Sequence, residues 1–257
     1  MVNQAAVQKA RSRQGELRRT ISLFTLFRKE PTEPDRFYEF LADDTIERLR
    51  AYAPIADAVV LDVGGGPGYV ASALRSAGAH CLVAEYSAAE LVLHGRSPES
   101  AIRADGQALP VRSAGVDVCH SSNVLEHVPD PDSMLAEMVR VVRPGGLIYL
   151  SFTNWLSPWG GHETSPWHYF GGDWAARRWQ AKHGAAPKNH FGRSLYRVDV
   201  SHVLRWVRQR EDIEILRSGS RYLPSWTRPI LWIPGIRELA VWNLELILRR
   251  RVESVVD

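Results

Sequence analysis

The chain of 257 residues has little cysteine, little lysine and no long apolar run. Its two cysteines, Cys81 and Cys119, lie in apolar runs typical of strands, so we expect reduced core thiols and a cytoplasmic protein. No stretch reaches about 18 uncharged apolar residues, so no membrane-spanning helix is predicted. The N-terminus lacks the apolar core of a secretory signal peptide.

An excess of charge of one sign is also missing. The formal net charge is only +3, from 32 Lys and Arg against 29 Asp and Glu. With no basic stripe along the chain, this balance does not indicate a nucleic-acid partner. The hydrophobic content of 45% is ordinary for a globular protein, and the length suits one α/β domain with insertions. The sequence leaves the oligomeric state open.

Between residues 58 and 154, apolar runs of strand length alternate with segments of helical periodicity. This alternation favours right-handed βαβ units and a parallel sheet. The predicted fold class is α/β, with a doubly wound, seven-stranded, Rossmann-like sheet that is mostly parallel and ends in an antiparallel strand. The predicted strands are 58–63, 80–87, 100–106, 116–125, 147–154, 212–218 and 241–251, and the predicted helices are 37–53, 67–78, 88–95, 130–143 and 195–210.

The chain is predicted to divide at residue 54. Residues 1–53 form an N-terminal helical segment, and residues 54–257 form a domain with inserts at about 154–193 and 219–240. All nine tryptophans lie beyond residue 150, and five of them fall between Trp155 and Trp179. Rigid aromatic side chains often line apolar pockets, so this aromatic-rich first insert is a candidate ligand-binding segment. A packed subdomain without a ligand is the alternative.

A glycine-rich segment joins the first predicted strand to the following helix, in the sequence VVLDVGGGPGY. Its glycines are Gly64, Gly65, Gly66 and Gly68. Without Cβ atoms the backbone can approach a ligand closely, and the helix N-terminus offers free N–H groups. Tyr69 occupies the place of the last glycine of a dinucleotide site, and no Gly-Lys-Ser/Thr triplet of a P-loop follows. The spacing therefore disfavours both phosphate-binding motifs.

Three acids lie at the ends of predicted strands. Asp62 precedes the glycine loop, where a carboxylate can orient the loop and attract an ammonium group. Glu85 ends the second strand and can accept both hydroxyls of a ribose, as the equivalent acid does in NAD enzymes. Asp105 ends the third strand and can accept an amine proton of adenine. One such acid is often just an exposed carboxylate, but three in register indicate a nucleoside-bearing ligand.

Residues 58–154 resemble the class I S-adenosylmethionine-dependent methyltransferases, in particular the small-molecule group like the ubiquinone/menaquinone methyltransferases. The matching motifs are LDVGGGPGY, VAEYS, ADGQALP, VDVCHSSNVLEHVPDP and VRVVRPGGLIYLSFTN. The resemblance implies that S-adenosyl-L-methionine is the cofactor and that the glycine loop holds its methionine portion. The Gly66–Pro67 step replaces the Cys-Gly-Thr common in the family, which predicts a stiffer loop.

The same resemblance implies roles for residues that follow the second, third and fourth strands. It places Glu85 and the adjacent Tyr86 at the ribose. It places Asp105 and Gly106 at the adenine. Asn123 would line the floor of the site near the sulfonium.

Methyl transfer mainly requires placement of a nucleophile in line with an activated methyl group, and a hydroxyl nucleophile also benefits from a base. His127, after the fourth strand, is the first candidate for this base, and His168 in the aromatic insert is the second. For each, a packing role is the alternative. Glu126 could assist His127 or share a metal ion with it, but no third ligand is evident, so no metal is predicted.

The predicted function is methyl transfer to an apolar or lipid-like small molecule, with oxygen favoured over nitrogen or carbon. Basic and apolar residues mix in segments 17–29 and 221–251, as suits a bilayer interface, so peripheral membrane contact is expected. Packing of both segments on the domain is the alternative. The competing functions are a non-catalytic S-adenosylmethionine-binding module, disfavoured by the complete set of glycines and acids, and an NAD-dependent reductase, disfavoured by Tyr69.

Overall fold

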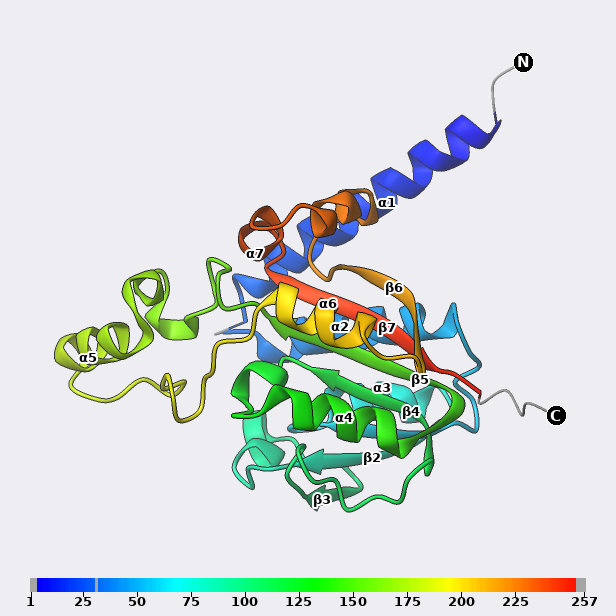
Figure 1. Cartoon of the computed structure of the whole chain (residues 1–257), viewed down its shortest axis with the longest axis horizontal. Coiled ribbons are helices and arrows are strands. Elements are labelled where there is room, and N and C mark those ends of the chain that lie inside the picture. Colours follow the sequence, from blue (N-terminus) through cyan, green and yellow to red (C-terminus); the bar gives the residue numbers. More distant parts are fainter. Residues whose placement is uncertain (1–3, 31, 253–257) are drawn as a thin grey trace.

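Seven strands form one sheet, in the order β3-β2-β1-β4-β5-β7-β6 (Figure 1). The computed structural model describes residues 4–30 and 32–252, with side chains from residue 13 onward. The strands are β1 (Val59–Val63), β2 (His80–Glu85), β3 (Ala101–Arg103), β4 (Val116–Ser122), β5 (Val142–Thr153), β6 (Ile213–Ser220) and β7 (Asn243–Arg250).

Strand β7 runs antiparallel to both of its neighbours, β5 and β6, and the other pairs are parallel. The predicted doubly wound, mostly parallel sheet with an antiparallel last strand is therefore confirmed. The strand order reverses between β1 and β4, because the chain moves outward from β1 to β3 and then returns to β4. Ligands of open α/β sheets bind outside the carboxyl ends of the strands at such a point.

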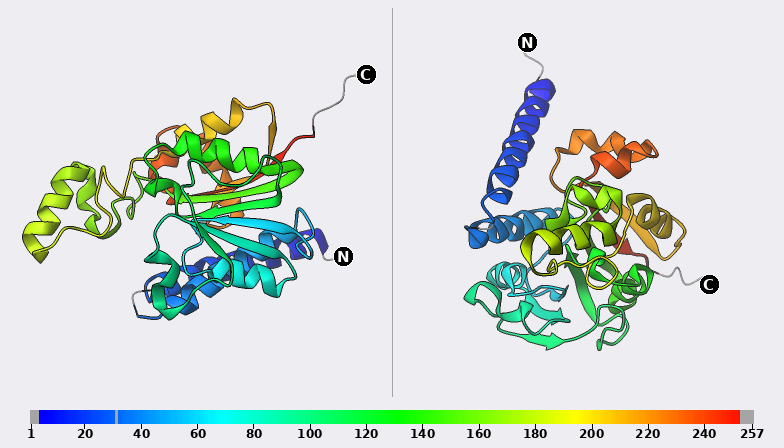
Figure 2. Two further views of the ribbon diagram at one scale, coloured as in Figure 1. Left: turned by 90° about the horizontal axis from the view of Figure 1, so that it is seen from below. Right: turned by 90° about the vertical axis from the view of Figure 1, so that its left-hand side faces the viewer.

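Helices cover both faces of the sheet (Figure 2). They are α1 (Gln4–Phe27), α2 (Pro34–Arg50), α3 (Tyr69–Ser76), α4 (Pro131–Val141), α5 (Gly172–His183), α6 (Val200–Arg208) and α7 (Ile236–Ala240). Alternate strand residues point to opposite faces. Leu61 and Ile148 therefore pack with α4 and α6, whereas Val60 and Tyr149 pack with α2 and α3. Both cysteines are buried and free, as predicted.

Several predicted boundaries differ from the structure. Pro67 lies before α3 and not in its first turn, because Gly68 adopts a left-handed conformation and begins the helix. Residues 88–95 form only a 3₁₀ segment, η1 (Glu90–Gly95), interrupted by non-helical residues. The last predicted helix begins at Val200 and not near residue 195. At this end of the helix, the Glu238 carboxylate accepts hydrogen bonds from the Val200 and Ser201 amides. This distant cap has no local sequence signal.

The N-terminal helix α1 packs on the domain through its C-terminal part. Leu23 is fully buried, and the Phe24 ring meets Trp242 edge-on at 5.3 Å. Leu17 and Ile21, which lie on the same helix, remain 48% and 56% exposed. The apolar residues of α1 are thus only partly covered by the protein.

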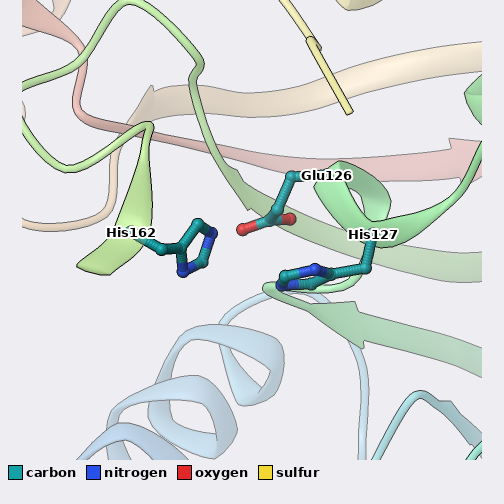
Figure 3. Close-up of side chains that lie close together, drawn as sticks. All are labelled: Glu126, His127 and His162. Atoms are coloured by element: carbon teal, nitrogen blue, oxygen red, sulfur yellow. The ribbon is translucent and has the colours of Figure 1, made fainter. Parts of the chain in front are cut away.

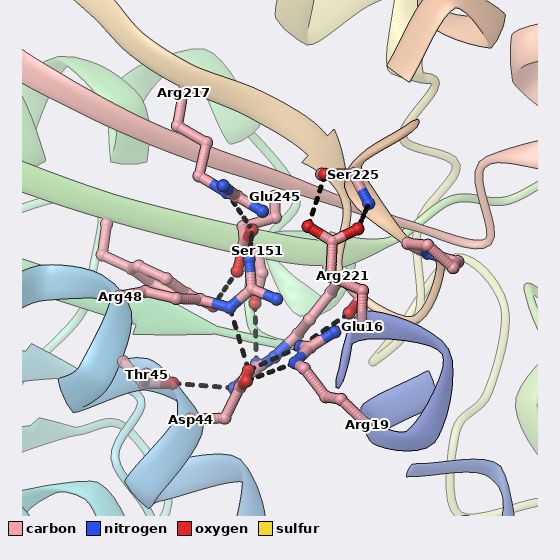
Figure 4. Close-up of polar contacts among 12 residues, drawn as sticks. Glu16, Arg19, Asp44, Thr45, Arg48, Ser151, Arg217, Arg221, Ser225 and Glu245 are labelled. Carbon is pink, nitrogen blue, oxygen red and sulfur yellow. Dashed lines mark hydrogen bonds and ion pairs between the residues drawn. The ribbon is translucent and has the colours of Figure 1, made fainter. Parts of the chain in front are cut away.

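A buried ionic network holds α1 and α2 against the sheet (Figure 4). At its centre the Arg221 side chain, which is fully buried, donates to the hydroxyls of Ser122, Ser151 and Thr45 and to the Leu41 carbonyl. These groups come from β4, β5 and α2. Arg221 therefore crosslinks three elements from the interior, whereas the sequence placed it on a basic surface segment.

The acids of this network are shared among several arginines. Asp44 on α2 pairs with Arg19 of α1 and Arg48, and Glu245 of β7 pairs with Arg48 and Arg217. Burial alone would raise the pKa of Asp44, but its arginine partners lower it overall. The network is therefore charged at neutral pH and binds the helical segment to the core.

The two predicted inserts contain short helices. The first projects from the end of β5 and holds the 3₁₀ turns η3 (His162–Thr164) and η4 (Trp167–Phe170) followed by α5 (Figure 1). The second lies between β6 and β7 and contains the 3₁₀ segment η5 (Ser225–Trp232) and α7. Within residues 4–30 and 32–252, no helix combines the length and apolar character needed to cross a bilayer.

Candidate active site

The glycine loop connects β1 to α3 at the carboxyl edge of the sheet. Gly64, Gly66 and Gly68 have φ angles of +70°, +49° and +84°, in the left-handed region that glycine adopts without strain. A Cβ atom at Gly64 would collide with the Val124 side chain, and one at Gly65 with the Asp62 carboxylate. Both the turn and its close approach to the end of β4 therefore depend on glycine.

Glu85 lies beneath this loop at the end of β2. Its side chain is buried, and its two carboxylate oxygens accept hydrogen bonds from the amides of Gly66 at 3.2 Å and Ser87 at 2.9 Å. The loop and the acid, 19 residues apart in sequence, are thus joined directly. Tyr86, the next residue, leaves 71% of its side chain exposed beside them.

Asp62 supports the loop from inside β1. Its Oδ1 lies 2.7 Å from Nδ1 of His120 on β4, both side chains are buried, and the His120 ring stacks on Tyr149. The second oxygen of Asp62 has no partner among the described residues. His120 was not among the residues predicted from the sequence. It could have been noticed as a polar residue in an apolar strand, and it lies opposite Asp62 in the β1–β4 register.

Asp105 and Gly106 follow β3, the neighbour of β2. Asp105 is half-buried and accepts hydrogen bonds from the backbone and side-chain nitrogens of Gln107 at 2.9 and 3.0 Å. A Cβ at Gly106 would only touch Met134 and Val63. The predicted adenine residues thus lie one strand beyond Glu85, at the same edge of the sheet.

Asn123 ends β4 in a left-handed conformation, with φ of +56°. Its amide donates to the Ser151 carbonyl, and its side-chain oxygen accepts from Asn243 of β7 at 2.7 Å. Asn123 is therefore fixed in the short connection between β4 and the 3₁₀ turn η2 (Leu125–His127).

Glu126 and His127 form η2, next to Asn123. Glu126 is buried, and its Oε1 accepts from the Thr153 amide at 2.9 Å. Burial raises the pKa of Glu126. Nδ1 of His127 lies 2.6 Å from the Ser194 carbonyl, which can only accept a hydrogen bond. The proton of a neutral His127 is therefore on Nδ1, and Nε2 carries a free lone pair.

His162, from the first insert, lies beside these two residues (Figure 3). Its ring centre is 5.0 Å from that of His127. Burial, together with the neighbouring His127, lowers the pKa of His162 to about 4, so its imidazole is neutral at pH 7. The sequence offered no pattern joining His162 to Glu126, because the two are brought together only by the path of the insert.

The second base candidate, His168, is placed differently. It is 1% exposed, with Nε2 at 3.2 Å from the Ser157 carbonyl and Nδ1 at 3.4 Å from the Ser165 hydroxyl. Trp155 packs against its ring. Since both nitrogens face protein oxygens, we withdraw His168 as a base and assign it to packing within the insert.

An aromatic pocket lies next to Glu126. Its lining residues come from α1, the end of β5, the first insert and both ends of the second insert: Phe24, Phe27, Thr153, Trp159, Tyr222 and Trp242. Thr153 is also the residue whose amide binds Glu126. An apolar pocket therefore adjoins the polar cluster of Glu126, His127 and His162.

Comparison with known proteins identifies the family. Residues 61–150 match the family described as Methyltransferase domain. An uncharacterized methyltransferase of Mycobacteroides abscessus is 46% identical over 250 residues, covering 91% of this chain and 95% of the relative. One of Mycobacterium bovis is 41% identical over 253 residues, covering 95% and 99%. The chain belongs to this methyltransferase family.

Solved structures agree with the fold of the methyltransferase. An S-adenosylmethionine-dependent methyltransferase from Mesorhizobium loti superimposes with a TM-score of 0.54 at 19% identity, over 79% of this chain and 96% of the other. One from Methanosarcina mazei has a TM-score of 0.54 at 16% identity, over 80% and 98%. The chain therefore has the fold of S-adenosylmethionine-dependent methyltransferases. Its membership in a methyltransferase family disfavours the alternatives of an NAD-dependent reductase and a non-catalytic module.

The residues at the carboxyl edge fit this cofactor. A buried carboxylate at the end of β2 suits a ribose diol, and a loop without Cβ atoms admits an amino-acid moiety against the backbone. When bound, S-adenosylmethionine supplies a methyl group already activated by its sulfonium. The protein must therefore supply an acceptor site, alignment and exclusion of water.

Proposed function

We propose that the methyltransferase methylates an oxygen atom of an apolar, lipid-like small molecule bound in the aromatic pocket. The observation that carries the proposal is that an apolar pocket adjoins a polar cluster. Five aromatic residues and Thr153 line the pocket, and the Thr153 amide donates a hydrogen bond to Glu126. An acceptor with an apolar body and a hydroxyl end suits this arrangement, with the hydroxyl directed toward the cluster that contains Glu126 and His127. The resemblance of the sequence motifs to those of the ubiquinone/menaquinone methyltransferases favours the same class of acceptor.

The cofactor residues are assigned within this proposal. The glycine loop and the free oxygen of Asp62 receive the methionine portion. Glu85 exchanges its hydrogen bonds to Gly66 and Ser87 for the ribose hydroxyls, with Tyr86 covering the sugar. Asp105 and Gly106 contact the adenine, and Asn123 borders the reacting methyl group.

His127 serves as the base in this proposal. Its Nδ1–H is held by the Ser194 carbonyl, so the lone pair of Nε2 is oriented and free to accept the hydroxyl proton. The oxygen electron pair then forms the bond to the methyl carbon, and the sulfur–carbon bond breaks. Glu126 is buried beside His127, so the cluster contains a second acid–base group.

The proposal is tested with pairs of acceptors that share one apolar body and differ in carrying a hydroxyl or an amine. We expect transfer to the hydroxyl member. His127→Asn keeps a donor for Ser194 but has no Nε2, so its rate should drop about 100-fold. Transfer to the amine alone, or an unchanged rate in His127→Asn, contradicts the proposal.

We further propose peripheral contact with a membrane, through the second insert and α1. Trp226, Trp232, Ile233, Ile236 and Leu239 are about half exposed or more on η5 and α7. The Ser225 amide and hydroxyl bind Glu16, which places this surface beside the exposed Leu17 and Ile21 of α1. Apolar and aromatic side chains of this kind suit the headgroup boundary.

Basic residues contribute less to this surface than the sequence predicted. Arg221 is buried, Arg249 and Arg250 donate to backbone carbonyls, and Arg237 donates to Ser201. Arg228 is exposed. The proposed contact therefore depends mainly on apolar insertion. We place it at the cytoplasmic face, in keeping with the free thiols of Cys81 and Cys119.

A further inference from the structure

The cluster beside the aromatic pocket has the composition of a metal site. Glu126 and His127 come from η2 and His162 from η3, and Figure 3 shows the three side chains pointing toward one another. One ligand atom from each residue lies within 4.8 Å of the other two. Three ligand types that bind metals thus meet at one point, from segments separated by β5.

Two potential ligand atoms of this cluster have no partner among the described residues. They are Oε2 of Glu126, whose side chain is 1% exposed, and Nε2 of His162. Leaving a buried polar atom unsatisfied is costly, so such atoms are expected to share a bound species. A carboxylate oxygen and an imidazole lone pair are both electron donors, so a cation satisfies them together.

Outer contacts hold two of the three side chains in place. The Nδ1–H of His127 is bound by the Ser194 carbonyl, which is how metal-binding histidines are commonly oriented. The second oxygen of Glu126 is held by the Thr153 amide. For His162 only the backbone is fixed, by the bond from its amide to the Trp159 carbonyl at 2.8 Å.

From this geometry we infer that Glu126, His127 and His162 bind one divalent transition-metal ion, with zinc as the best match. Two imidazoles and a carboxylate form a common zinc ligand set, with bonds of about 2.0–2.2 Å. Tetrahedral ligands at such distances lie roughly 3.4 Å apart, so small rotations of the three side chains close the site. The fourth position is left for the acceptor.

This inference rests on the proposed function for its acceptor, a hydroxyl of an apolar small molecule, and it replaces the role of His127 as the base with that of a metal ligand. The ion binds the acceptor hydroxyl and lowers its pKa, so that the proton passes to water. The oxygen electron pair then attacks the methyl carbon, and the sulfur keeps the electrons of the broken bond. His127 in this case holds the ion and does not itself take the proton.

Cobalt(II) provides a direct probe of the site, because its visible absorption reports nitrogen and oxygen ligation without any turnover. The full chain, stripped with a chelator, is titrated with cobalt and then with zinc as competitor. We expect one cobalt per chain, displaced by zinc. His162→Gln and Glu126→Gln should each weaken binding about 100-fold. His183→Gln, at an exposed histidine of α5, is the matched control and should bind as the unmodified chain does.

The outcomes separate the metal site from the proposed function. No cobalt spectrum from the folded, unmodified chain overturns the site, and so does binding that survives both His162→Gln and Glu126→Gln. Methylation of a hydroxyl acceptor by metal-free protein also overturns it, while the proposed function stands. Cobalt binding that requires His162, without transfer to any apolar hydroxyl acceptor, supports the site and removes the proposed function.

Discussion

The proposed cofactor side and the proposed acceptor side of this enzyme are built in different ways. On the cofactor side, residues at neighbouring strand ends meet directly, as Gly66 and Glu85 do across 19 positions. On the acceptor side, the pocket combines Phe24 of α1, Trp159 of the first insert and Trp242 of the second. The donor site therefore follows from one edge of the sheet, whereas the acceptor site depends on how distant segments pack.

Arg221 crosslinks β4, β5 and α2, and its removal should give the largest effect. Arg221→Met leaves the hydroxyls of Ser122, Ser151 and Thr45 without their donor and removes a buried charge near Asp44. We expect a loss of about 3–5 kcal/mol in the free energy of unfolding, measured with urea. Arg217→Met, at a half-exposed member of the network, should cost about 1 kcal/mol or less. Equal stability of the two variants contradicts a crosslinking role for Arg221.

Glu85→Gln should affect the cofactor side alone. The amide keeps the size of the side chain but loses its charge and turns an NH₂ group toward a backbone donor. The Kd for S-adenosylmethionine should rise about 10- to 100-fold by calorimetry, with the acceptor KM unchanged. Glu99→Gln, at a glutamate with 84% of its side chain exposed, is the control. A comparable rise in the acceptor KM would show that the two sides are not separate.

Trp159→Ala should affect the acceptor side alone. It removes a pocket wall that meets Phe27 and Trp242, so the acceptor KM should rise about 10-fold while the cofactor Kd stays constant. Trp174→Ala, on the projecting α5, is the matched control and should change neither value. A reduced cofactor affinity in Trp159→Ala would contradict the separation of the cofactor side from the acceptor side.

The smallest expected effect concerns the membrane surface. Trp232, which is 70% exposed, makes no pocket contact, so Trp232→Ser should leave transfer to a dissolved acceptor unchanged. Its flotation with anionic liposomes should fall about fivefold, close to 1 kcal/mol. Trp174→Ser again serves as the control. If the unmodified protein does not float at low salt, the membrane proposal is wrong.

The sequence predicted most of the sheet and the cofactor loop, because these depend on local patterns. Glycines with left-handed φ angles, an acid at the end of β2 and alternating apolar runs all leave local signals. His162 could not be joined to Glu126 in this way, since only the folded path of the first insert brings them together. Arg221 was misplaced for the same reason: a local count of basic residues cannot show that one of them is buried.

The central claim is that a methyl donor bound at the sheet edge meets an apolar acceptor held by the aromatic pocket. Methyl-labelled S-adenosylmethionine, incubated with the enzyme and a fractionated cell extract, tests it most directly. We expect label in an organic-phase product as a base-stable ether, lost in Glu85→Gln at low cofactor concentration and in Trp159→Ala at low acceptor concentration. Label confined to polar metabolites or to protein would contradict it.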